Sequence, residues 1–529
     1  MKILVAEPLA AAGIDLLKAQ PGWEVIVSNP KEYAQHLPTT EALIVRSAVK
    51  VNNDVLSKAP KLKVIGRAGV GVDNVDLPAA TAAGVLVMNT PGGNAVSVAE
   101  HTIALMLGLA RAIPQASAST KSGKWEKKKF LGSELRGKTL GVIGLGSIGR
   151  ELVKRAAPFE MKILAHDPYV SSLTAADLHV ELVDLKTIFQ QSDYISLHMA
   201  LTPETNKLIS KDALANMKPG VRIINCARGE LIDQDALNEA MASGKVAGAG
   251  LDVFEKEPPA AEAPILQQDN LIATPHIGGS TEEAQEIVGV RIVEQIVEYL
   301  QHGVALNAVN MPALSPDQYR DTVPYVTLAE RLGNFAAHVS TGNPKAVRLI
   351  YKGRIAEQNT NLMRNGGVAG VLNRSLSRKA NLVNALQLAG DRGWAVEERH
   401  EKRETHIDSI RLELDTDSGC TAVEGAVILG RPRLVAIDDI YIEAPLAGHL
   451  TFLKNDDVPG VIGYVGNVLG QNHINIASFA LGRKDAPVAP DHPLEAVSVF
   501  ETDTAVPDAV LVELLKNQAI SMARPVEFL

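Results

Sequence analysis

A glycine-rich turn, GLGSIG, stands at residues 144–149, between the apolar run LGVI and the helical run RELVKRAA. In this context Gly144 turns the chain tightly, Gly146 lets a pyrophosphate approach the backbone, and Gly149 permits close packing of helix on strand. Asp167 ends the next apolar run, where a carboxylate can bind a ribose 2′-hydroxyl, and no arginine follows it directly to accept a 2′-phosphate. The turn therefore favours NAD over NADP. The alternative is a purely structural turn that Asp167 caps.

On both sides of this turn, short apolar runs alternate with helical stretches. The first series extends from Met1 to about Val87, and the second begins with LGVIG. Strands that are apolar on both faces and alternate with helices predict parallel sheets covered on both sides. We expect an α/β chain with two doubly wound, Rossmann-like lobes and a cleft between them. A single long helix is predicted over about 95–118, and another over about 287–300 that returns the chain to the first lobe.

The remaining sequence is too long to join the same core. At 529 residues the chain should divide into roughly three or four domains. Residues from about 311 to 444 have a different composition and no catalytic cluster. Residues 445–529 follow the pattern of a small α+β unit, with a strand, a helix, two strands, a helix and a last short strand.

Charge and composition exclude several classes of protein. A formal net charge of -9 and an aromatic content of 4% disfavour binding to nucleic acid or to an anionic membrane. Cys226 and Cys420 stand far apart, so neither a disulfide framework nor a metal site is predicted, and a reducing cytoplasm fits. The N-terminus is a poor export signal, and no apolar run approaches the roughly 20 residues that span a bilayer.

Three polar residues follow apolar runs in the second series: Arg228 in NCARGELID, Glu257 in FEKEP and His276 in TPHIGG. Oxidation of a secondary alcohol needs a base for the hydroxyl proton, and an imidazole suits reversible proton transfer near neutral pH. A carboxylate can orient that ring, and a guanidinium matches a substrate carboxylate. Together they predict hydride transfer at a 2-hydroxy acid.

Each of these residues also has an ordinary interpretation when taken alone. Arg228 could be a surface cation in a turn, Glu257 a solvated acid before prolines, and His276 a helix cap. Asp252, in GLDVF, either points toward the nicotinamide end of a cofactor or only forms hydrogen bonds at its strand end.

GLGSIG, NCARGELID, GLDVFEKEP and ATPHIGGST resemble the motifs of the D-isomer-specific 2-hydroxyacid dehydrogenases. The resemblance implies that Arg228 binds the substrate carboxylate and that Glu257 and His276 form the proton-transfer pair. It also implies a discontinuous first lobe that closes over the nucleotide lobe. The residues that the resemblance assigns to NAD binding are Gly144, Gly146, Ser147, Ile148, Gly149, Asp167, Thr202, Ala227, Asp252 and His276.

VRSAVKV, IGRAGVGVDNVD and NTPGGNAVSVAEHT are similar to first-lobe segments of the long members of this family. The similarity implies oxidation of D-3-phosphoglycerate to 3-phosphohydroxypyruvate, the entry to serine synthesis. Arg46 is then a phosphate contact, although Arg46 and Arg67 could also be two surface cations at strand ends. The implied substrate-site residues are Arg46, Ser47, Gly71, Asn94, Arg228 and His276.

The same similarity implies a division into four parts. These are a substrate lobe (1–97 and 285–310), an NAD-binding lobe (98–284), an intervening domain of the allosteric substrate-binding type (311–444) and a ferredoxin-like ACT domain (445–529).

KNDDVPGVIG and NHINIA in the last part resemble ACT domains of amino-acid-regulated enzymes. This implies that Asn455, Asp457 and Asn475 hold L-serine across paired ACT domains, with a homotetramer favoured. These residues could instead only cap and turn the chain.

Several alternatives stay open from the sequence. The basic run 127–129 beside Trp125 is either a solvated loop or a segment that reaches a neighbouring subunit's substrate. The chain could act on an unphosphorylated acid such as glyoxylate or hydroxypyruvate. It could also be an NAD-sensing interaction protein of the corepressor type, or a serine sensor without catalysis.

Overall fold

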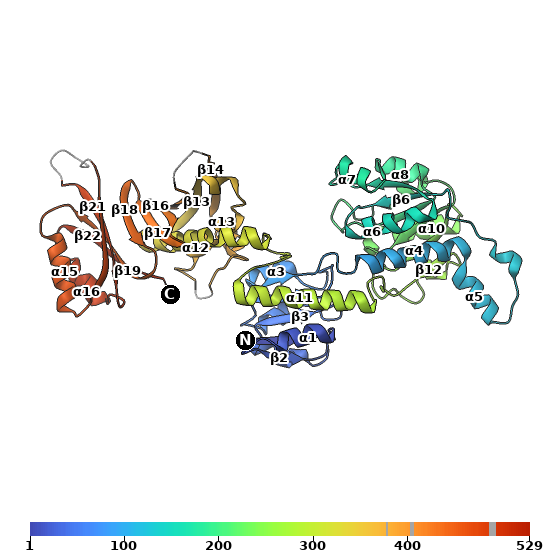
Figure 1. Ribbon diagram of the computed structural model, residues 1–529, viewed down its shortest axis with the longest axis horizontal. Coiled ribbons are helices and arrows are strands. Elements are labelled where there is room, and N and C mark those ends of the chain that lie inside the picture. Colours follow the sequence, from blue (N-terminus) through green and yellow to red (C-terminus); the bar gives the residue numbers. More distant parts are fainter. Residues whose placement is uncertain (377–378, 403–406, 486–492, 529) are drawn as a thin grey trace.

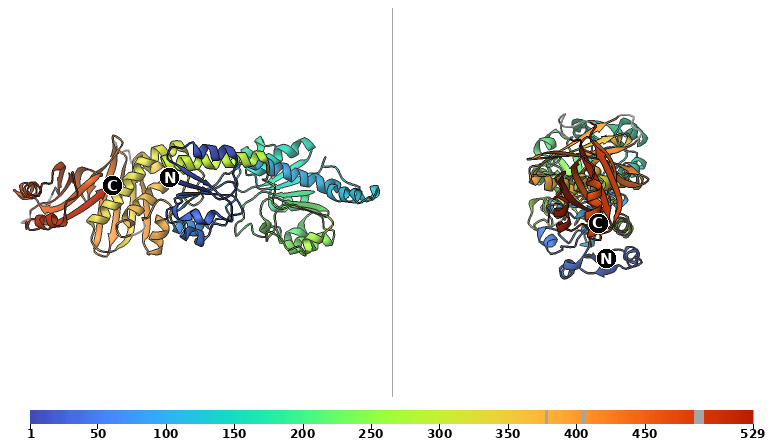
Figure 2. Two further views of the ribbon diagram at one scale, coloured as in Figure 1. Left: turned by 90° about the horizontal axis from the view of Figure 1, so that it is seen from below. Right: turned by 90° about the vertical axis from the view of Figure 1, so that its left-hand side faces the viewer.

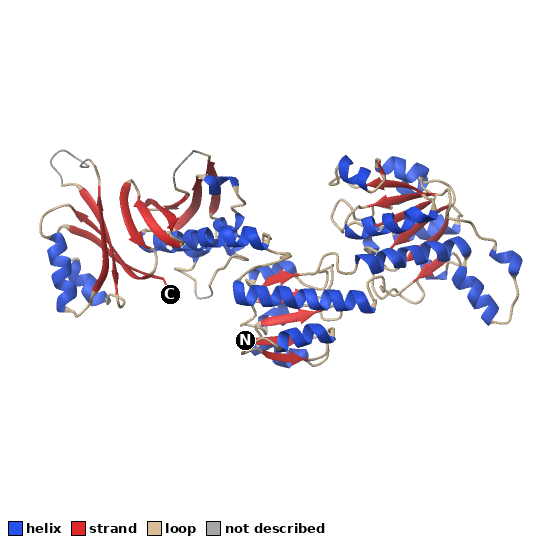
Figure 3. Ribbon diagram, in the orientation of Figure 1, coloured by secondary structure: helices blue, strands red, loops and turns tan. Residues whose placement is uncertain are grey.

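The described residues form four sheets, which lie in a row along the longest axis of the molecule (Figures 1 and 3). The computed structural model describes residues 1–376, 379–402, 407–485 and 493–528. The left view of Figure 2 shows the same row, with the nucleotide-turn lobe at one end and the C-terminal sheet at the other, and the right view looks along it.

The first lobe contains a parallel sheet in the order β2-β1-β3-β4-β5. One face buries an apolar cluster under α2 and α3, and the other face is covered by α1 and α11. The helix α11 comes from far along the chain, so the predicted return to the first lobe is observed. The elements are β1 Lys2–Val5, α1 Ala11–Lys18, β2 Glu24–Val27, η1 Tyr33–Thr39, β3 Ala42–Val45, α2 Asn53–Ser57, β4 Val64–Arg67, α3 Leu77–Ala82, β5 Leu86–Met88 and α11 Glu282–His302.

Glycines allow α11 to lie close to its neighbours. A Cβ on Gly13 of α1 would lie 2.9 Å from the carbonyl oxygen of Gly289, and a Cβ on Gly66 of β4 would lie 2.6 Å from Ile296. Any larger side chain at Gly13 or Gly66 would force α11 away from the sheet.

The second lobe contains a parallel sheet in the order β12-β11-β10-β9-β6-β7-β8. The chain enters at β6, moves to one edge, and then crosses back to β9, which places a topological switch point beside the end of β6. Its elements are β6 Thr139–Ile143, α6 Ser147–Ala156, η3 Ala157–Phe159, β7 Lys162–His166, α7 Ser172–Asp177, β8 Glu181–Leu182, α8 Leu185–Gln191, β9 Tyr194–Leu197, α9 Lys211–Asn216, β10 Val221–Asn225, η4 Gly229–Leu231, α10 Gln234–Ala242, β11 Val246–Leu251, η5 Pro264–Gln267 and β12 Leu271–Ala273.

The single helix predicted over 95–118 is wrong, because the structure has two helices, α4 (Ala95–Arg111) and α5 (Ile113–Lys121). Ala112 between them is left-handed, with φ 48°. Pro114 has no backbone N–H to continue the first helix. Among the described residues no single helix is long and apolar enough to cross a membrane; α4 and α5 reach that length and composition only as a pair bent by 64°.

The third sheet is mixed, in the order β14-β13-β15-β16-β17-β18, and α12 packs against β15, β16 and β17. Its core continues into the next sheet, where the rings of Phe335 and Phe452 meet edge to face at 6.0 Å. Its elements are α12 Pro316–Val339, β13 Pro344–Lys352, η6 Arg354–Glu357, α13 Asn361–Leu372, α14 Ala385–Asp391, β14 Ala395–Glu401, β15 Ser409–Thr416, β16 Gly419–Ile428, β17 Arg431–Ile437 and β18 Ile440–Pro445.

The last sheet is antiparallel, in the order β20-β21-β19-β22, and α15 and α16 bury a separate apolar cluster against it. The last strand has nine residues and is longer than predicted. The predicted fold class, two parallel-sheet lobes followed by α+β units, is confirmed, and the boundaries between the four parts stay predictions. The elements are β19 Gly448–Asp456, α15 Val461–Gln471, β20 Ile476–Arg483, β21 Glu495–Thr502, α16 Asp508–Leu514 and β22 Ile520–Phe528.

Candidate active site

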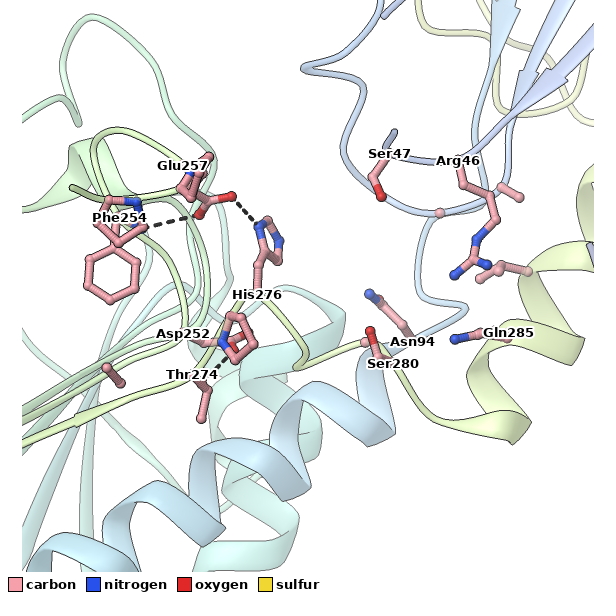
Figure 4. Close-up of a pocket in the computed structure, with 18 of the residues that line it drawn as sticks. Arg46, Ser47, Asn94, Asp252, Phe254, Glu257, Thr274, His276, Ser280 and Gln285 are labelled. Carbon is pink, nitrogen blue, oxygen red and sulfur yellow. Dashed lines mark hydrogen bonds and ion pairs between the residues drawn. The ribbon is translucent and has the colours of Figure 1, made fainter. Parts of the chain in front are cut away.

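A cavity of about 670 Å³ opens between the first and second lobes. Residues after β3 and β4 line it from the first lobe, and residues after β11 and β12 line it from the second (Figure 4). Among the predicted site residues, the ones that line this cavity are Arg46, Ser47, Asn94, Asp252, Glu257 and His276.

The glycine turn has the geometry that its three glycines predict. Gly144 has φ +99°, and a Cβ there would lie 2.5 Å from the carbonyl oxygen of His198. A Cβ on Gly149 would lie 2.1 Å from the carbonyl oxygen of Gly144, whereas a Cβ on Gly146 would meet nothing within 4 Å. The space at Gly146, at the start of α6, is therefore open for a phosphate group. Ser147 and Ile148 form the first turn of that helix.

Asp167 lies beside this turn, because its Oδ2 atom accepts a hydrogen bond of 2.8 Å from the backbone N–H of Leu145. Its Oδ1 atom accepts one of 2.9 Å from Tyr169. The carboxylate is thus held next to the open glycine, where a ribose would follow a bound pyrophosphate. These residues fit an NAD molecule.

Two further predicted cofactor contacts lie at the ends of other strands of the same sheet. Ala227 follows β10 and donates its N–H to the Asn225 side chain at 3.0 Å. Thr202 follows β9 on an exposed loop, where its hydroxyl lies 3.3 Å from that of Thr205.

His276 and Glu257 form a hydrogen-bonded pair at the cavity (Figure 4). The Nδ1 atom of His276 lies 2.7 Å from Oε2 of Glu257, and Oε1 accepts from the backbone N–H of Phe254 at 3.2 Å. His276 has φ +54° and its ring is half exposed. The pair therefore leaves Nε2 of the ring open to a substrate.

Asp252 is buried under the loop that carries His276. Its carboxylate accepts hydrogen bonds from Thr274 at 2.6 Å and from the backbone N–H groups of Ile277 and Gly278, each at 2.8 Å. His101 of α4 lies 3.4 Å away. Burial alone would raise the pKa of Asp252, but its partners together hold that pKa below its usual value. The contacts of Asp252 thus organise the loop, and no spacing in the sequence indicates its contact with His101.

Arg228 stands directly after Ala227 and reaches the first lobe. Its Nη2 atom lies 2.8 Å from Oδ2 of Asp73, and its Nη1 donates to the carbonyl oxygen of Ala227 at 2.6 Å. Gly71 lies against the guanidinium, because a Cβ there would be 2.0 Å from Nη2. The two predicted residues Arg228 and Gly71 are therefore brought together across the two lobes.

Arg46 and Ser47 reach the cavity on a loop that a buried acid holds in place. Glu7 accepts hydrogen bonds from the backbone N–H groups of Arg46 at 2.8 Å, Ala48 at 3.0 Å and Val49 at 2.9 Å. In Figure 4 the side chains of Arg46, Ser47 and Asn94 lie on the opposite side of the cavity from His276.

The lining of the cavity also includes residues that the sequence did not assign to the site, among them Gln285, Ser280 and Arg67. Gln285 and Ser280 lie close to Arg46 and Asn94 in Figure 4, and Arg67 ends β4. Burial lowers the pKa of Arg67, and the nearby Arg228 lowers it further. Gln285 lies on α11, outside the motifs of the sequence, whereas Ser280 lies within ATPHIGGST, four residues after His276.

The three predicted serine-site residues lie at two ends of the last sheet. Asn455 ends up buried on β19, with its Nδ2 donating to Asp456, and Asp457 forms an ion pair of 3.1 Å with Arg483. Asn475 donates a hydrogen bond of 3.0 Å to the carboxylate of Asp503. It lies next to the other end of β19, since its neighbour Ile476 and His449 of β19 both pair with Thr502. One copy of this domain does not bring Asn475 to Asp457.

The basic run 127–129 forms a short 3-10 turn, η2 (Lys127–Phe130), after α5. Trp125 and Leu131 on either side of it are 85% and 95% exposed. The helix α5 projects from the second lobe in Figure 1, so this segment is free of the cavity in its own chain.

Comparison with known proteins covers the whole chain. Residues 103–278 match the NAD binding domain of D-isomer specific 2-hydroxyacid dehydrogenases, and residues 321–438 match the D-3-phosphoglycerate dehydrogenase intervening domain. The chain is 43% identical over 533 residues to D-3-phosphoglycerate dehydrogenase of Archaeoglobus fulgidus, with 100% of both chains covered. It is 38% identical to that of Bacillus subtilis, with 97% of this chain and 99% of the relative covered.

Solved structures resemble the first two lobes. D-lactate dehydrogenase of Aquifex aeolicus, complexed with NAD and lactic acid, covers 59% of this chain and 100% of its own, with 30% identity and a TM-score of 0.53. NAD-dependent formate dehydrogenase of Staphylococcus aureus, in complex with NAD, covers 57% and 96%, with 31% identity and a TM-score of 0.51. The predicted cofactor, NAD, is confirmed by the matched domain. The chain belongs to the D-3-phosphoglycerate dehydrogenases, oxidoreductases of the D-isomer specific 2-hydroxyacid dehydrogenase family.

Proposed function

We propose that this protein oxidises D-3-phosphoglycerate to 3-phosphohydroxypyruvate with NAD, as the first step of phosphorylated L-serine biosynthesis. One observation carries the proposal: the His276–Glu257 pair, in the lobe that holds the glycine turn, faces Arg46, Ser47 and Asn94 across the cavity between the two lobes. The names of the full-length relatives support the same substrate.

In this proposal Arg228 holds the substrate carboxylate through its planar pair of donors. His276 Nε2 accepts the proton of the C2 hydroxyl as the C2–H bond breaks, and Glu257 keeps the ring oriented and stabilises its positive charge. Bound NAD supplies the acceptor for the C2 hydride. The imidazolium then releases its proton to solvent. Closure of the two lobes would exclude water during the transfer.

Arg46 is proposed to bind the substrate phosphate, with Ser47, Gly71 and Asn94 beside it. A phosphate site of this kind distinguishes D-3-phosphoglycerate from unphosphorylated acids such as glyoxylate or hydroxypyruvate. Each charged hydrogen bond contributes about 1.5–3 kcal/mol, so loss of the phosphate should reduce kcat/KM by about tenfold or more.

The test is NADH formation by the purified protein with D-3-phosphoglycerate and, separately, with D-glycerate. We expect fast turnover of the phosphorylated acid and weak turnover of the other. Equal turnover of both would favour a dehydrogenase for unphosphorylated acids. Absence of NADH with either substrate, while NAD still binds, would favour an interaction protein that senses NAD.

We also propose that L-serine regulates the enzyme at the last domain. Asp457 can hold an ammonium group, and the start of α15 offers backbone donors to a carboxylate. Because Asp457 and Asn475 lie at two ends of one sheet, roughly 25 Å apart at 3.3 Å per residue along the strand, a joint site needs two copies side by side. This requirement supports a homo-oligomer, and a tetramer is proposed.

Mixed oligomers test this arrangement. Asp457→Ala and Asn475→Ala should each abolish inhibition by serine, and mixing the two variants should restore part of it, because one complete wild-type site then forms between two different copies. Inhibition that persists in either single variant would contradict the proposal.

Cytoplasmic location is proposed from the free thiols of Cys226 and Cys420, which suit a reducing compartment.

A further inference from the structure

The guanidinium of Arg228 is already paired with an acid of the other lobe. Asp73, on the loop after β4, brings Oδ2 to 2.8 Å from Nη2 of Arg228. Among the described residues this ion pair is the only hydrogen bond or ion pair that the Asp73 carboxylate makes. The carboxylate of Asp73 therefore binds the same Arg228 guanidinium to which the proposed function assigns the substrate carboxylate.

The backbone around the pair is shaped for this close approach. Gly71 lies beneath it, and a Cβ there would stand 2.0 Å from Nη2 of Arg228 and 2.7 Å from Oδ2 of Asp73. Any side chain at Gly71 would separate the guanidinium from the acid. Because Gly71 has no side chain, a carboxylate of the protein or of a ligand can reach Arg228.

The acids near the cavity differ in how firmly they are held. Glu7 is 5% exposed and accepts three backbone hydrogen bonds, and Asp252 is 1% exposed with four partners. The Asp73 side chain is 67% exposed and has one partner. Asp73 can thus leave into water at small cost, whereas Glu7 and Asp252 cannot leave without breaking the loops they support.

The charges around the pair also favour exchange of one anion for another. Arg67 lies near both partners of the pair. Burial has the largest effect and lowers the pKa of Arg67, Arg228 lowers it further, and Asp73 raises it. Its Nε atom is buried without a hydrogen-bond partner among the described residues. Removal of Asp73 without a replacement would leave Arg67 and Arg228 as neighbouring cations, with Glu7 as the remaining acid that acts on Arg67.

We propose that Asp73 is a place-holder for the substrate carboxylate. In the free enzyme it pairs with Arg228 and ties the two lobes together, and the incoming carboxylate displaces it into solvent and takes over its hydrogen bond. This inference rests on the proposed function, because it assumes that Arg228 binds the substrate carboxylate. Asp73 therefore weakens binding of every ligand that must compete for Arg228, and it leaves ligands without a carboxylate unaffected.

The size of the effect follows from the exposure of the pair. Exposed ion pairs contribute about 0.2–1 kcal/mol, so competition should weaken binding up to about fivefold. Asp73→Asn keeps the shape and removes the charge. Asp54→Asn is a matched control, because Asp54 is also in the first lobe, its side chain is also 67% exposed, and it forms an ion pair with Lys58 at 2.7 Å.

The experiment compares two ligands by titration calorimetry without NAD: D-3-phosphoglycerate, and glycerol 3-phosphate, which has the phosphate and lacks the carboxylate. In Asp73→Asn we expect Kd for phosphoglycerate to fall about two- to fivefold, with Kd for glycerol 3-phosphate and the melting temperature unchanged. Asp54→Asn should match the wild type. Asp73→Ser, which also removes the charge, should repeat the gain.

An unchanged or higher Kd for phosphoglycerate in both Asp73 variants would overturn the inference. An equal gain for both ligands would overturn it too, because it would indicate a general charge effect instead of competition for Arg228. Failure of the wild-type enzyme to oxidise phosphoglycerate would count against the proposed function itself, so the two failures are distinguishable.

Discussion

The Nδ1 atom of His276 lies 2.7 Å from Oε2 of Glu257, and the other oxygen of that carboxylate is anchored by the backbone N–H of Phe254. The Phe254 N–H therefore holds the Glu257 carboxylate, and that carboxylate in turn orients the ring of His276. Because Nδ1 is engaged with Glu257, the free Nε2 atom is the one available for proton transfer.

This relationship predicts unequal effects of two substitutions. His276→Ala removes the base and should lower kcat by about 100- to 10,000-fold, whereas Glu257→Gln keeps the base and should cost less. Steady-state NADH formation measures both. NADH binding to Glu257→Gln, followed by fluorescence, is the control and should not change. Near-wild-type kcat in His276→Ala would contradict the assignment.

Arg228 should be sensitive even to replacement by another cation. Lysine offers a point charge instead of a planar pair of donors, so Arg228→Lys should raise KM for phosphoglycerate by about tenfold, and Arg228→Ala should remove most turnover. KM for NAD serves as the control. A Lys variant with wild-type KM would show that the planar geometry is not used.

Two glycines of the nucleotide turn form a matched pair for separating binding from folding. A Cβ on Gly146 meets no protein atom within 4 Å, so Gly146→Ala should keep the melting temperature and raise KM for NAD. A Cβ on Gly149 would meet the carbonyl oxygen of Gly144 at 2.1 Å, so Gly149→Ala should lower the melting temperature by several degrees. Thermal unfolding and NAD titration test both, and the reverse pattern would refute this assignment.

Asp167 should determine the choice between the two nicotinamide cofactors. Its carboxylate lies beside the turn at Leu145 and would repel a 2′-phosphate. Asp167→Asn retains an oxygen for the backbone N–H of Leu145 but loses the charge, so the ratio of kcat/KM for NAD over NADP should fall by about tenfold. An unchanged ratio would mean that the ribose lies elsewhere.

Asp252 should stabilise the fold in a pH-dependent way. Asp252→Asn places an amide group against the N–H donors of Ile277 and Gly278 and should cost about 2–4 kcal/mol at neutral pH. Since the folded pKa of Asp252 lies below its usual value, its contribution is complete above the unfolded value of about 3.9 and is lost as pH falls through the folded value. Denaturant unfolding of the wild type and of Asp252→Asn should therefore show a smaller difference in unfolding free energy at pH 3 than at pH 7.

Much of this molecule is determined by local sequence. Strand periodicity, the spacing of Gly144, Gly146 and Gly149, and the acid directly after β7 all act within a few residues, so they predicted the two parallel sheets and the cofactor. The sequence also predicted the chemistry of Arg228, Glu257 and His276, because each follows its own strand and parallel strands end at one edge of a sheet.

The tertiary structure decided which distant residues meet. Whether Asp73 pairs with Arg228, whether His101 supports Asp252, and whether Gln285 joins the cavity depend on how the two lobes and α11 pack, which no short segment encodes. The separation of Asp457 from Asn475 likewise follows from strand register in the last sheet. Local patterns determine strands, helices and turns, because their hydrogen bonds and backbone angles are local. Long-range contacts depend on the summed burial of many side chains, so only the folded chain fixes them.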